Sequence, residues 1–482
     1  MPSLFGNPNP TKIVCTIGPA TNAPEQVVRL AEAGMDVARL NFSHGDHETH
    51  RRTIEYIRSI SCDKHCEIAI LADLQGPKIR VGKLQGGEPV LLRAGDRVVI
   101  DVNAQLGDAS RLSTTYPELA HDIQPGERVL VADGLVELRV LETTPTTVRC
   151  EVVYGGTIRE HAGINLPGVA VSSPSMTEKD RSDLEFAISE GVDYVALSFV
   201  RSAEDIRQIK RVIAHLGADT PVVGKLEKPE ALEELGPIVA ASDVVMVARG
   251  DLAVETSAGQ VPVLQKRIIA ECSRQRVPVI TATQMLESMT NNPRPTRAEA
   301  SDVANAVFDG TDALMLSGET AIGEYPVETV RTMRSIATIA EKELRRSDTA
   351  LSAPLVGTGF LDFADSVARA AADTAEVLDA KVIVAFTQSG STARLVSKCR
   401  PRMPIIAATP LPRTACRCSL YWGVHPLLIE PVQHTDEMIS NVDRQLNELG
   451  ICNEGDVVVV TAGTPIGRCG TTNTMKVHVV GS

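Results

Sequence analysis

The sequence predicts an α/β protein made of a parallel (β/α)8 barrel, an inserted β-barrel lid domain and a C-terminal open α/β sheet domain. Three observations predict this fold class. Short apolar runs alternate with helical patterns, the runs end in polar residues, and one long region shows strand patterns without a convincing helical period. We expect the barrel to comprise residues 1–75 and 168–345, the lid 76–167, and the C-terminal domain 346–482.

The barrel strands can be followed in order along the chain. The first, at residues 11–19, closes on Gly-Pro, and a helical pattern at 24–33 leads to a second strand at 35–45. Another helical pattern, at 47–60, precedes the third strand at 67–80. After the inserted region the same rhythm supplies five more strands, at 192–200, 221–227, 243–250, 277–284 and 312–320. Eight such strands are the count of a TIM barrel.

Residues 222–255 concentrate charge at the ends of two of these strands. Lys225 and Glu227 close one apolar run, and Arg249 and Asp251 close the next. Active sites of such barrels lie at the carboxyl ends of the strands. Carboxylates and a lysine held there could seat a divalent metal beside a phosphate. A set of strand-end ion pairs in an ordinary barrel is the alternative at this point.

The inserted region consists of short alternating strand patterns separated by Gly, Pro and Asp turns. An insertion after the third strand lies above the carboxyl end of the barrel. We therefore expect it to act as a lid over the active site, with a passive decoration as the alternative.

The C-terminal region begins with an amphipathic helical pattern at 363–378. Apolar strands that alternate with helices predict an open sheet. The sequence shows four of these strands, at 380–387, 403–409, 425–430 and 456–463. The turn Thr387–Arg394 follows the first strand, and its hydroxyls, glycine and free N–H groups could bind a phosphate. A plain N-cap turn is the alternative.

Composition limits the class of protein. Of 482 residues 43% are hydrophobic but only 3% are aromatic, so aliphatic side chains must fill the cores. The formal net charge of −13 argues against a general binder of nucleic acid or membrane surfaces. The N-terminal segment has no apolar signal region, and no apolar run is long enough to cross a bilayer, which favours a cytoplasmic protein.

Ten scattered cysteines are interpreted as reduced thiols. Cys62 and Cys66 flank His65, and Cys416 lies close to Cys418, but neither pair has the matching second half that a zinc site needs.

Six motifs in order make the chain resemble the pyruvate kinase family over nearly its whole length. They are ARLNFSHG (38–45), DLQGPKIR (73–80), NLPG (165–168), GKLEKPEA (224–231), ARGDLAVE (248–255) and TATQMLESM (281–289). The resemblance implies a phosphotransferase of glycolysis that transfers the phosphoryl group of phosphoenolpyruvate to ADP, giving pyruvate and ATP.

In that family catalysis consists of positioning and charge neutralisation. The resemblance implies that Glu227 and Asp251 hold Mg²⁺, with Mn²⁺ as a substitute, and that Lys225 stabilises the phosphoryl group in transfer. It assigns the transferred phosphate to Arg39 and the substrate carboxylate to the backbone N–H of Gly250.

The resemblance also implies roles around the enolate and the nucleotide. Thr283 would line the pocket where the enolate takes up its proton, through water and Ser317, and Arg80 would bind the nucleotide phosphates. The remaining nucleotide and ion shell would comprise Asn41, Ser43, His44 and Lys179. A structural role is an equal alternative for His44, and a solvated position at a helix start is an equal alternative for Lys179.

Two residues depart from the family pattern. Lys78 stands where potassium-requiring members carry an acidic residue, so we expect its ammonium group to replace K⁺. A weak monovalent-ion pocket at Asn41, Ser43 and Asp73 is retained as an alternative. Ala162 stands where many members have lysine, which puts one contact between lid and nucleotide in doubt.

The C-terminal turn matches the family's site for a sugar-phosphate activator. The residues that would bind one phosphate are Thr387, Ser389, Gly390, Ser391 and Thr392. The later loop offers only Arg468 as a fixed charge for a second phosphate, so we favour a monophosphate. The family is usually tetrameric, and activation would couple distant sites.

Two rival functions remain open from the sequence. A metal-dependent lyase or aldolase acting on a 2-oxo acid could use the same carboxylates, although Arg80, His44 and the lid argue against it. A catalytically idle metabolite sensor is the other, and intact Lys225, Glu227 and Thr283 argue against that.

Overall fold

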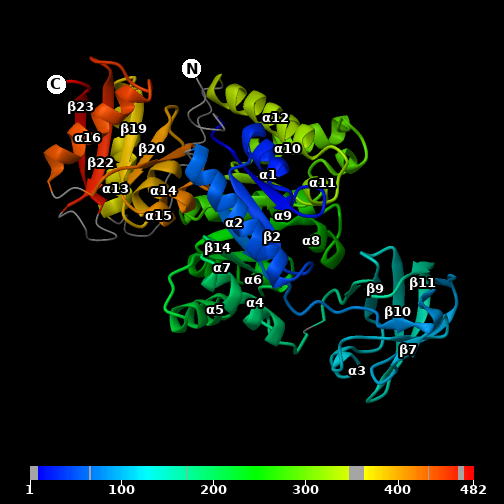
Figure 1. The fold of residues 1–482 in the computed structure, drawn as a ribbon. Coiled ribbons are helices and arrows are strands. Elements are labelled where there is room, and N and C mark those ends of the chain that lie inside the picture. The colour runs from blue at the N-terminus through cyan, green and yellow to red at the C-terminus, as the bar shows by residue number, and fades with distance from the viewer. Residues whose placement is uncertain (1–8, 65–66, 170, 347–362, 432–433, 465–471) are drawn as a thin grey trace.

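The computed structural model describes residues 9–64, 67–169, 171–346, 363–431, 434–464 and 472–482. The side chains of 61–64, 435 and 436 are not among the described parts. The central barrel lies between the C-terminal domain on one side and the inserted domain on the other (Figure 1).

The barrel confirms the predicted fold class. Its eight parallel strands close in the order β1-β18-β17-β16-β15-β14-β3-β2. Their interior is filled by aliphatic side chains, because parallel strands covered on both faces must be apolar on both. The strands are β1 (Lys12–Ile17), β2 (Val37–Asn41), β3 (Ala69–Asp73), β14 (Tyr194–Leu197), β15 (Val222–Leu226), β16 (Val244–Ala248), β17 (Val279–Ala282) and β18 (Ala313–Leu316).

Helices surround the barrel and cover its outer face. Local sequence explains several starts: Thr177 caps α4 and Thr296 caps α10, each in a reciprocal capping box with the residue three positions on. The helices are α1 (Pro24–Ala33), α2 (His47–Lys64), α4 (Glu178–Ser189), α5 (Ala203–His215), α6 (Glu230–Glu233), α7 (Leu235–Ala241), α8 (Arg249–Glu255), α9 (Val261–Arg274), the 3₁₀ helix η2 (Glu287–Thr290), α10 (Arg297–Phe308), α11 (Gly318–Ala321) and α12 (Pro326–Arg346).

The inserted domain has its own aliphatic core. A six-stranded sheet in the order β13-β9-β10-β11-β6-β8 dominates it, with two small two-stranded sheets beside it. Its elements are β4 (Lys83–Leu84), η1 (Gln85–Gly87), β5 (Val90–Leu92), β6 (Arg97–Asp101), β7 (Leu106–Gly107), β8 (Arg111–Ser113), α3 (Leu119–Asp122), β9 (Arg128–Val131), β10 (Val136–Thr143), β11 (Thr147–Tyr154), β12 (Gly156–Ile158) and β13 (Ile164–Asn165).

The C-terminal domain is an open sheet in the order β21-β20-β19-β22-β23. The sequence analysis missed β23, which pairs antiparallel with β22 at the sheet edge. Its apolar residues Met475, Val477 and Val479 are exposed while Thr472 and His478 are buried, so its sequence carries only a weak strand signal. The elements are α13 (Phe363–Val377), β19 (Val382–Phe386), α14 (Ser391–Ser397), β20 (Ile405–Thr409), α15 (Pro412–Cys418), β21 (Val424–Leu428), α16 (Thr435–Glu448), β22 (Val457–Gly463) and β23 (Thr472–Val479).

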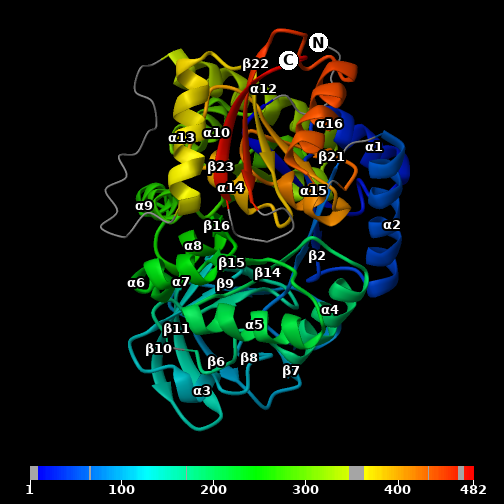
Figure 2. The same cartoon turned by 90° about the vertical axis from the view of Figure 1, so that its left-hand side faces the viewer.

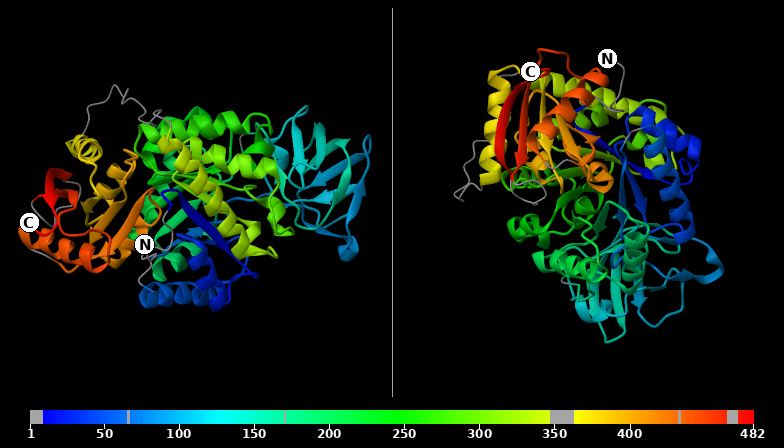
Figure 3. Two further views of the ribbon diagram at one scale, coloured as in Figure 1. Left: turned by 90° about the horizontal axis from the view of Figure 1, so that it is seen from above. Right: turned by 60° about the vertical axis from the view of Figure 1, so that its left-hand side comes forward.

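The two outer domains lie at opposite ends of the barrel (Figures 2 and 3). The C-terminal domain packs at the amino ends of the strands, where Lys12 Nζ donates to the Val424 carbonyl at 2.8 Å and the Tyr194 hydroxyl to the Arg417 carbonyl at 2.7 Å. The inserted domain lies at the carboxyl ends, as a lid requires. Among the described helices, none has both the length and the apolar character to span a bilayer.

The cysteines with described side chains are free thiols: Cys15, Cys150, Cys272, Cys399, Cys416, Cys418 and Cys452. His65 and Cys66, and the side chain of Cys62, lie outside the described residues.

Candidate active site

The polar residues at the carboxyl ends of β2, β3 and β15 form one connected network. Arg39 Nε lies 2.7 Å from Asp73 Oδ2, and Lys225 Nζ lies 3.2 Å from Asp73 Oδ1 and 2.9 Å from Glu227 Oε1. All four side chains are nearly buried. The structure thus brings together residues that are far apart in the sequence, at the end of the barrel where chemistry is expected.

Alternating charge stabilises the ionised forms in this network. Burial lowers the pKa of Lys225, but the Asp73 and Glu227 carboxylates outweigh it and hold that pKa above its usual value. Burial raises the pKa of Asp73, yet Lys225 and Arg39 together lower it overall. A cationic lysine therefore stands ready at neutral pH to meet an incoming anion.

Glu227 and Asp251 supply the oxygen donors that a divalent cation needs. Burial raises the pKa of Glu227, and Lys225 opposes this while the charge of Asp251 adds to it, so the two carboxylates interact. Glu227 also accepts a hydrogen bond from the Phe199 N–H at 2.7 Å. No group of three or more His, Cys, Asp or Glu side chains suited to a metal occurs in the described residues. Two carboxylates fit Mg²⁺, which completes its shell with substrate oxygens and water.

The turns after β16 and β17 are hydrogen-bonded to each other. The Gly250 N–H donates to Thr283 Oγ1 at 2.7 Å, and Thr283 and Gln284 have φ values of +68° and +52°. Such left-handed geometry is unfavourable for a β-branched residue and needs support from its surroundings. Here the Gly250 N–H is bonded to Thr283, and not free as the predicted carboxylate site would require.

Arg249 provides that support, and the sequence analysis did not include it among the site residues. Its Nη2 donates to the carbonyls of Thr283 at 2.8 Å and Gln284 at 3.1 Å, while Nη1 pairs with Asp302 at 2.7 Å. Its place one residue before Gly250 was visible in the sequence, but only its contacts show that it reaches the carbonyls after β17 and Asp302.

The end of β18 carries Ser317 and the fully buried Glu319. Glu319 accepts from the Ser317 N–H at 2.7 Å and from the Leu286 N–H at 3.2 Å, so it fixes one loop against the next. Within the described structure the Ser317 hydroxyl is buried without a hydrogen-bond partner.

Residues predicted for the nucleotide lie around the root of the lid. Arg80 Nη1 donates to the His161 carbonyl of the lid at 2.9 Å. His44 is exposed at the loop after β2. Partial desolvation, and then the positive charges of Arg80, Lys78 and Arg39, lower the pKa of His44. Each of these three cations therefore acts on His44.

Three further predicted residues have structural partners. Lys179 Nζ donates to the Phe42 carbonyl at 2.7 Å and pairs with Asp183 at 2.5 Å. Asn41 Oδ1 accepts from the Ser43 N–H at 3.1 Å, which shapes the loop. Lys179 lies in the first turn of α4 with 52% of its side chain exposed, which agrees with the alternative of a solvated lysine at a helix start. A cavity of about 440 Å³ between lid root and barrel includes Lys78, Thr115, Tyr116, Ser172 and Lys179 in its lining.

A polar contact joins lid and barrel, and the sequence analysis missed it. Asn165 Nδ2 in the lid donates to Glu255 Oε1 at 2.9 Å, and Lys228 pairs with the same oxygen at 2.9 Å. Asp251 and Lys78 line the small cavity beside this contact. Ala162 is partly buried and packs against the lid core.

The predicted effector turn lies between β19 and α14. Gly390 has φ +86°, and its N–H donates to Thr387 Oγ1 at 2.9 Å. The Thr392 hydroxyl pairs with that of Thr472 at 2.7 Å, whereas Ser389 is exposed. Three of the five hydroxyl and glycine positions, Thr387, Gly390 and Thr392, thus already have internal partners. Arg468 lies outside the described residues.

Comparison with known proteins agrees with this arrangement. Residues 9–330 match the family model described as pyruvate kinase, barrel domain, and residues 365–478 match pyruvate kinase, alpha/beta domain. Pyruvate kinases of Staphylococcus aureus strains USA300 and NCTC 8325 are 45% identical over 478 residues, covering 98% of this chain and 80% of theirs.

A solved structure leads to the same assignment. The crystal structure of a pyruvate kinase from Cryptosporidium parvum superimposes with a TM-score of 0.90 at 37% identity, covering 98% of this chain and 96% of that one. The fold and the matches over the barrel and the C-terminal domain agree. The chain therefore belongs to the pyruvate kinase family of phosphotransferases.

Proposed function

We propose that the network of Arg39, Asp73, Lys225 and Glu227 is the site of phosphoryl transfer from phosphoenolpyruvate to ADP. The observation that carries this proposal is the convergence of two cations and two carboxylates in one buried cluster at the carboxyl ends of the strands. The transition state of phosphoryl transfer spreads negative charge over oxygens, so fixed cations are the groups that stabilise it.

The phosphate of phosphoenolpyruvate would bind to Arg39 and Lys225, which now contact Asp73. Glu227 and Asp251 would hold Mg²⁺ or Mn²⁺, which when bound would neutralise charge on substrate oxygens. The Gly250 N–H would donate to the substrate carboxylate once the Thr283 hydroxyl moves from it.

The transfer breaks the bond between phosphorus and the enol oxygen and forms one to an ADP oxygen. The remaining enolate becomes pyruvate when its methylene carbon takes up a proton. Thr283 lies next to the site, and the unpartnered Ser317 hydroxyl lies at the neighbouring strand end. We assign proton delivery to water held by these two hydroxyls.

The nucleotide would occupy the 440 Å³ cavity at the lid root, with its phosphates toward Arg80 and with Asn41, His44 and Lys179 around it. For Lys179 this requires release from Asp183 or binding through water. The lid, proposed as 76–167, would close over the barrel of 1–75 and 168–345 and exclude water.

We also propose that Lys78 makes K⁺ unnecessary. It lines the cavities on both sides of the lid root, and its charge acts on His44. A fixed ammonium can supply the positive charge that a bound K⁺ otherwise supplies; Asn41, Ser43 and Asp73 would then form no required ion site.

The C-terminal domain, 346–482, would be regulatory, with a sugar monophosphate at Thr387, Ser389, Gly390, Ser391 and Thr392 as activator. The glycine turn and exposed Ser389 support this site. We further propose a cytoplasmic homotetramer of glycolysis, on the family's usual assembly.

The first experiment measures pyruvate formed from phosphoenolpyruvate with Mg²⁺, with and without ADP, in a large organic-cation buffer free of K⁺. ADP-dependent pyruvate supports the kinase and the role of Lys78 together. Pyruvate without ADP would instead support a lyase-like barrel. Activity that appears only on adding K⁺ would overturn the proposal for Lys78, and Lys78→Glu should create such a requirement.

The sensor alternative is tested with Lys225→Met. This variant should lose catalysis while retaining binding of glucose 6-phosphate, the probe for the C-terminal turn. A parent protein that binds the probe but forms no pyruvate under any of these conditions would favour the sensor.

A further inference from the structure

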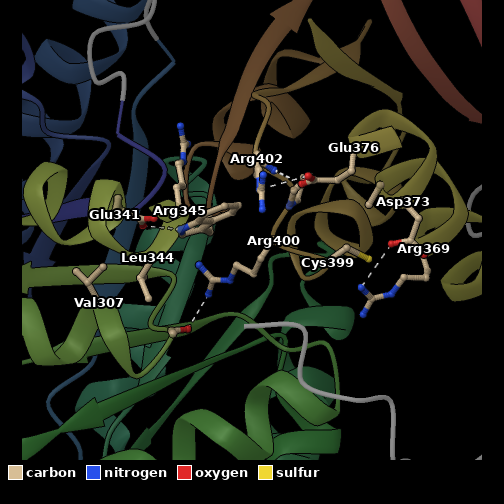
Figure 4. A pocket seen from close by; sticks show the side chains of 14 residues that line it. Val307, Glu341, Leu344, Arg345, Arg369, Asp373, Glu376, Cys399, Arg400 and Arg402 are labelled. Carbon is tan, nitrogen blue, oxygen red and sulfur yellow. Dashed lines mark hydrogen bonds and ion pairs between the residues drawn. The ribbon is translucent and has the colours of Figure 1, made fainter. Parts of the chain in front are cut away.

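A second cavity, of about 230 Å³, lies between the barrel and the C-terminal domain, at the end of the barrel opposite the active site. Barrel helices α10 and α12 line one side, while α13 and the segment after α14 line the other (Figure 4). The lining residues are Val307, Gly310, Glu341, Leu344, Arg345, Arg369, Ala372, Asp373, Glu376, Cys399, Arg400, Pro401, Arg402 and Trp422.

Four arginines face three carboxylates in this lining, and Glu376 pairs with one of the arginines, its Oε2 lying 3.4 Å from Arg402 Nε. Glu341 is nearly buried and accepts from Trp422 Nε1 at 2.8 Å. Glu376 accepts from the backbone N–H of Arg402 at 2.8 Å. Asp373, with 66% of its side chain exposed, lies 4.0 Å from Arg369. Positive donors are therefore in excess.

Two guanidinium groups retain unused donors. Arg345, at the end of α12, is exposed and makes no hydrogen bond or ion pair within the described structure. The Nε of Arg369, in α13, is buried and has no partner among the described atoms. Buried N–H donors are normally satisfied, so an orphan donor beside a cavity indicates a missing acceptor. One arginine belongs to the barrel and the other to the C-terminal domain.

Arg400 forms a rigid wall of the cavity. Its Nη2 donates to the Gly310 carbonyl at 2.6 Å and to Asp312 Oδ1 at 2.9 Å, and its guanidinium lies 4.6 Å from the centre of the Trp422 ring. These contacts hold the cation in place before any ligand arrives. Val307 and Leu344 add apolar surface. The cavity is thus preorganised for an anion with a small organic part.

We propose that this cavity binds a small organic anion, a phosphate monoester or a dicarboxylate, between Arg345 and Arg369. Guanidinium groups bind both kinds of anion through paired N–H donors. A ligand held by arginines of both domains couples its binding to their relative position. This site is separate from the turn at Thr387–Thr392 and does not depend on the function assigned to it.

The test is calorimetric titration of the full-length chain with glycerol 3-phosphate and, separately, with succinate. Ser389→Glu serves as the background, because an exposed carboxylate at the effector turn removes anion binding there. We expect one binding event per chain that Arg345→Met and Arg369→Met each weaken at least tenfold. Binding of only one probe identifies the anion class.

Arg346→Met is the matched control. Arg346 is on the same helical turn as Arg345 and is likewise exposed, with 79% of its side chain accessible, but it pairs with Glu343 and does not line the cavity. It should leave the affinity unchanged within twofold. Absence of binding by both probes, or equal weakening by all three variants, would overturn the proposal. Arg345→Met, at a helix end, keeps the test valid should Arg369→Met fail to fold.

Discussion

At the scale of single residues, the site depends on charges that hold one another in place. Asp73 lies between Arg39 and Lys225 and keeps both side chains aimed at one point. Lys225 also donates to the Ser198 hydroxyl at 2.8 Å. A substrate phosphate can replace the carboxylate contacts without moving the cations far. Such preorganisation lowers the cost of reorganisation during the reaction.

Arg249 gives the first prediction. In Arg249→Lys one ammonium group cannot reach the two carbonyls and Asp302 together, so the turn at Thr283 and Gln284 should relax. Loss of about 1–3 kcal/mol of charge-assisted hydrogen bonding corresponds to roughly a 10- to 100-fold fall in kcat, with a smaller change in KM. Steady-state kinetics and exchange of pyruvate methyl protons with solvent would measure it.

The control for this prediction is Arg274→Lys. Arg274 forms an exposed ion pair with Glu271 at the end of α9, away from the site, so its replacement should leave kcat unchanged. An Arg249→Lys protein with parental kcat would show that the strained turn needs no support from this side chain.

The second prediction concerns pH and Mg²⁺. Burial, together with Asp251, raises the pKa of Glu227, so its carboxylate takes up a proton at a higher pH than an ordinary glutamate. Protons compete with metal; affinity for Mg²⁺ should therefore fall about tenfold per pH unit once the pH drops below this raised pKa. Titration of Mg²⁺ binding from neutral to mildly acid pH would show the fall.

Glu227→Gln should weaken Mg²⁺ binding and remove this pH dependence. Glu234→Gln, at an exposed position shortly after it, should change neither. A pH dependence that persists in Glu227→Gln would assign the titration to another group.

At the scale of elements, β15 shows how tightly the site strands are packed. A Cβ at Gly224, directly before Lys225, would lie 2.7 Å from Ser242 Oγ and 3.2 Å from Ile206 Cδ1. Glycine lets the strand approach α5 and the segment after α7. The position of Lys225 thus depends on the absence of a neighbouring side chain.

Gly224→Ala should therefore destabilise the protein by about 1–3 kcal/mol through overpacking. Ser242→Ala removes the oxygen that would clash and should restore part of this loss in the double variant. Urea unfolding would measure the changes. Gly259→Ala, where a Cβ would meet nothing within 4 Å, is the control. Equal effects of the two alanines would contradict the steric explanation.

At the scale of the whole molecule, the barrel lies between the candidate active site and the C-terminal domain. A buried ion cluster joins the barrel to the C-terminal domain. Lys398 Nζ lies 2.9 Å from Asp312 Oδ2, and Arg400 Nη2 lies 2.9 Å from Asp312 Oδ1. Lys398 and Asp312 are each 1% exposed in their side chains. Burial lowers the pKa of Lys398, even though Asp312 acts to raise it.

Asp312→Ala should cost about 3–5 kcal/mol, because it leaves a buried lysine unpaired. The loss should be smaller at alkaline pH. The stability of the folded protein rises as the pH passes the lowered pKa of the buried lysine, because the lysine then loses its charge. Asp219→Ala is the control, since its carboxylate is 78% exposed and pairs with Arg417 at the same domain boundary. It should cost less than about 1 kcal/mol.

Urea unfolding of both variants at neutral and alkaline pH would measure these differences. Equal losses in Asp312→Ala and Asp219→Ala would mean that Lys398 finds another partner or reaches water.

The sequence by itself determined the fold class and the residues at the strand ends. Apolar runs separated by helical patterns require buried parallel strands, and the strand ends then place Arg39, Lys225 and Glu227 on one rim. This inference is local, because each residue is located by its own strand. The half-exposed edge strand β23 lacked so clear a pattern and was missed.

Only the tertiary structure decided which residues touch. Asn165 meets Glu255 across 90 positions of sequence, and Arg249 turns to the carbonyls after β17 rather than toward the site mouth. The cavity with Arg345 and Arg369 exists only because two domains pack together. The local sequence pattern predicts which face of an element is apolar. Which distant residues that face contacts depends on how the elements pack, and a local pattern does not contain this information.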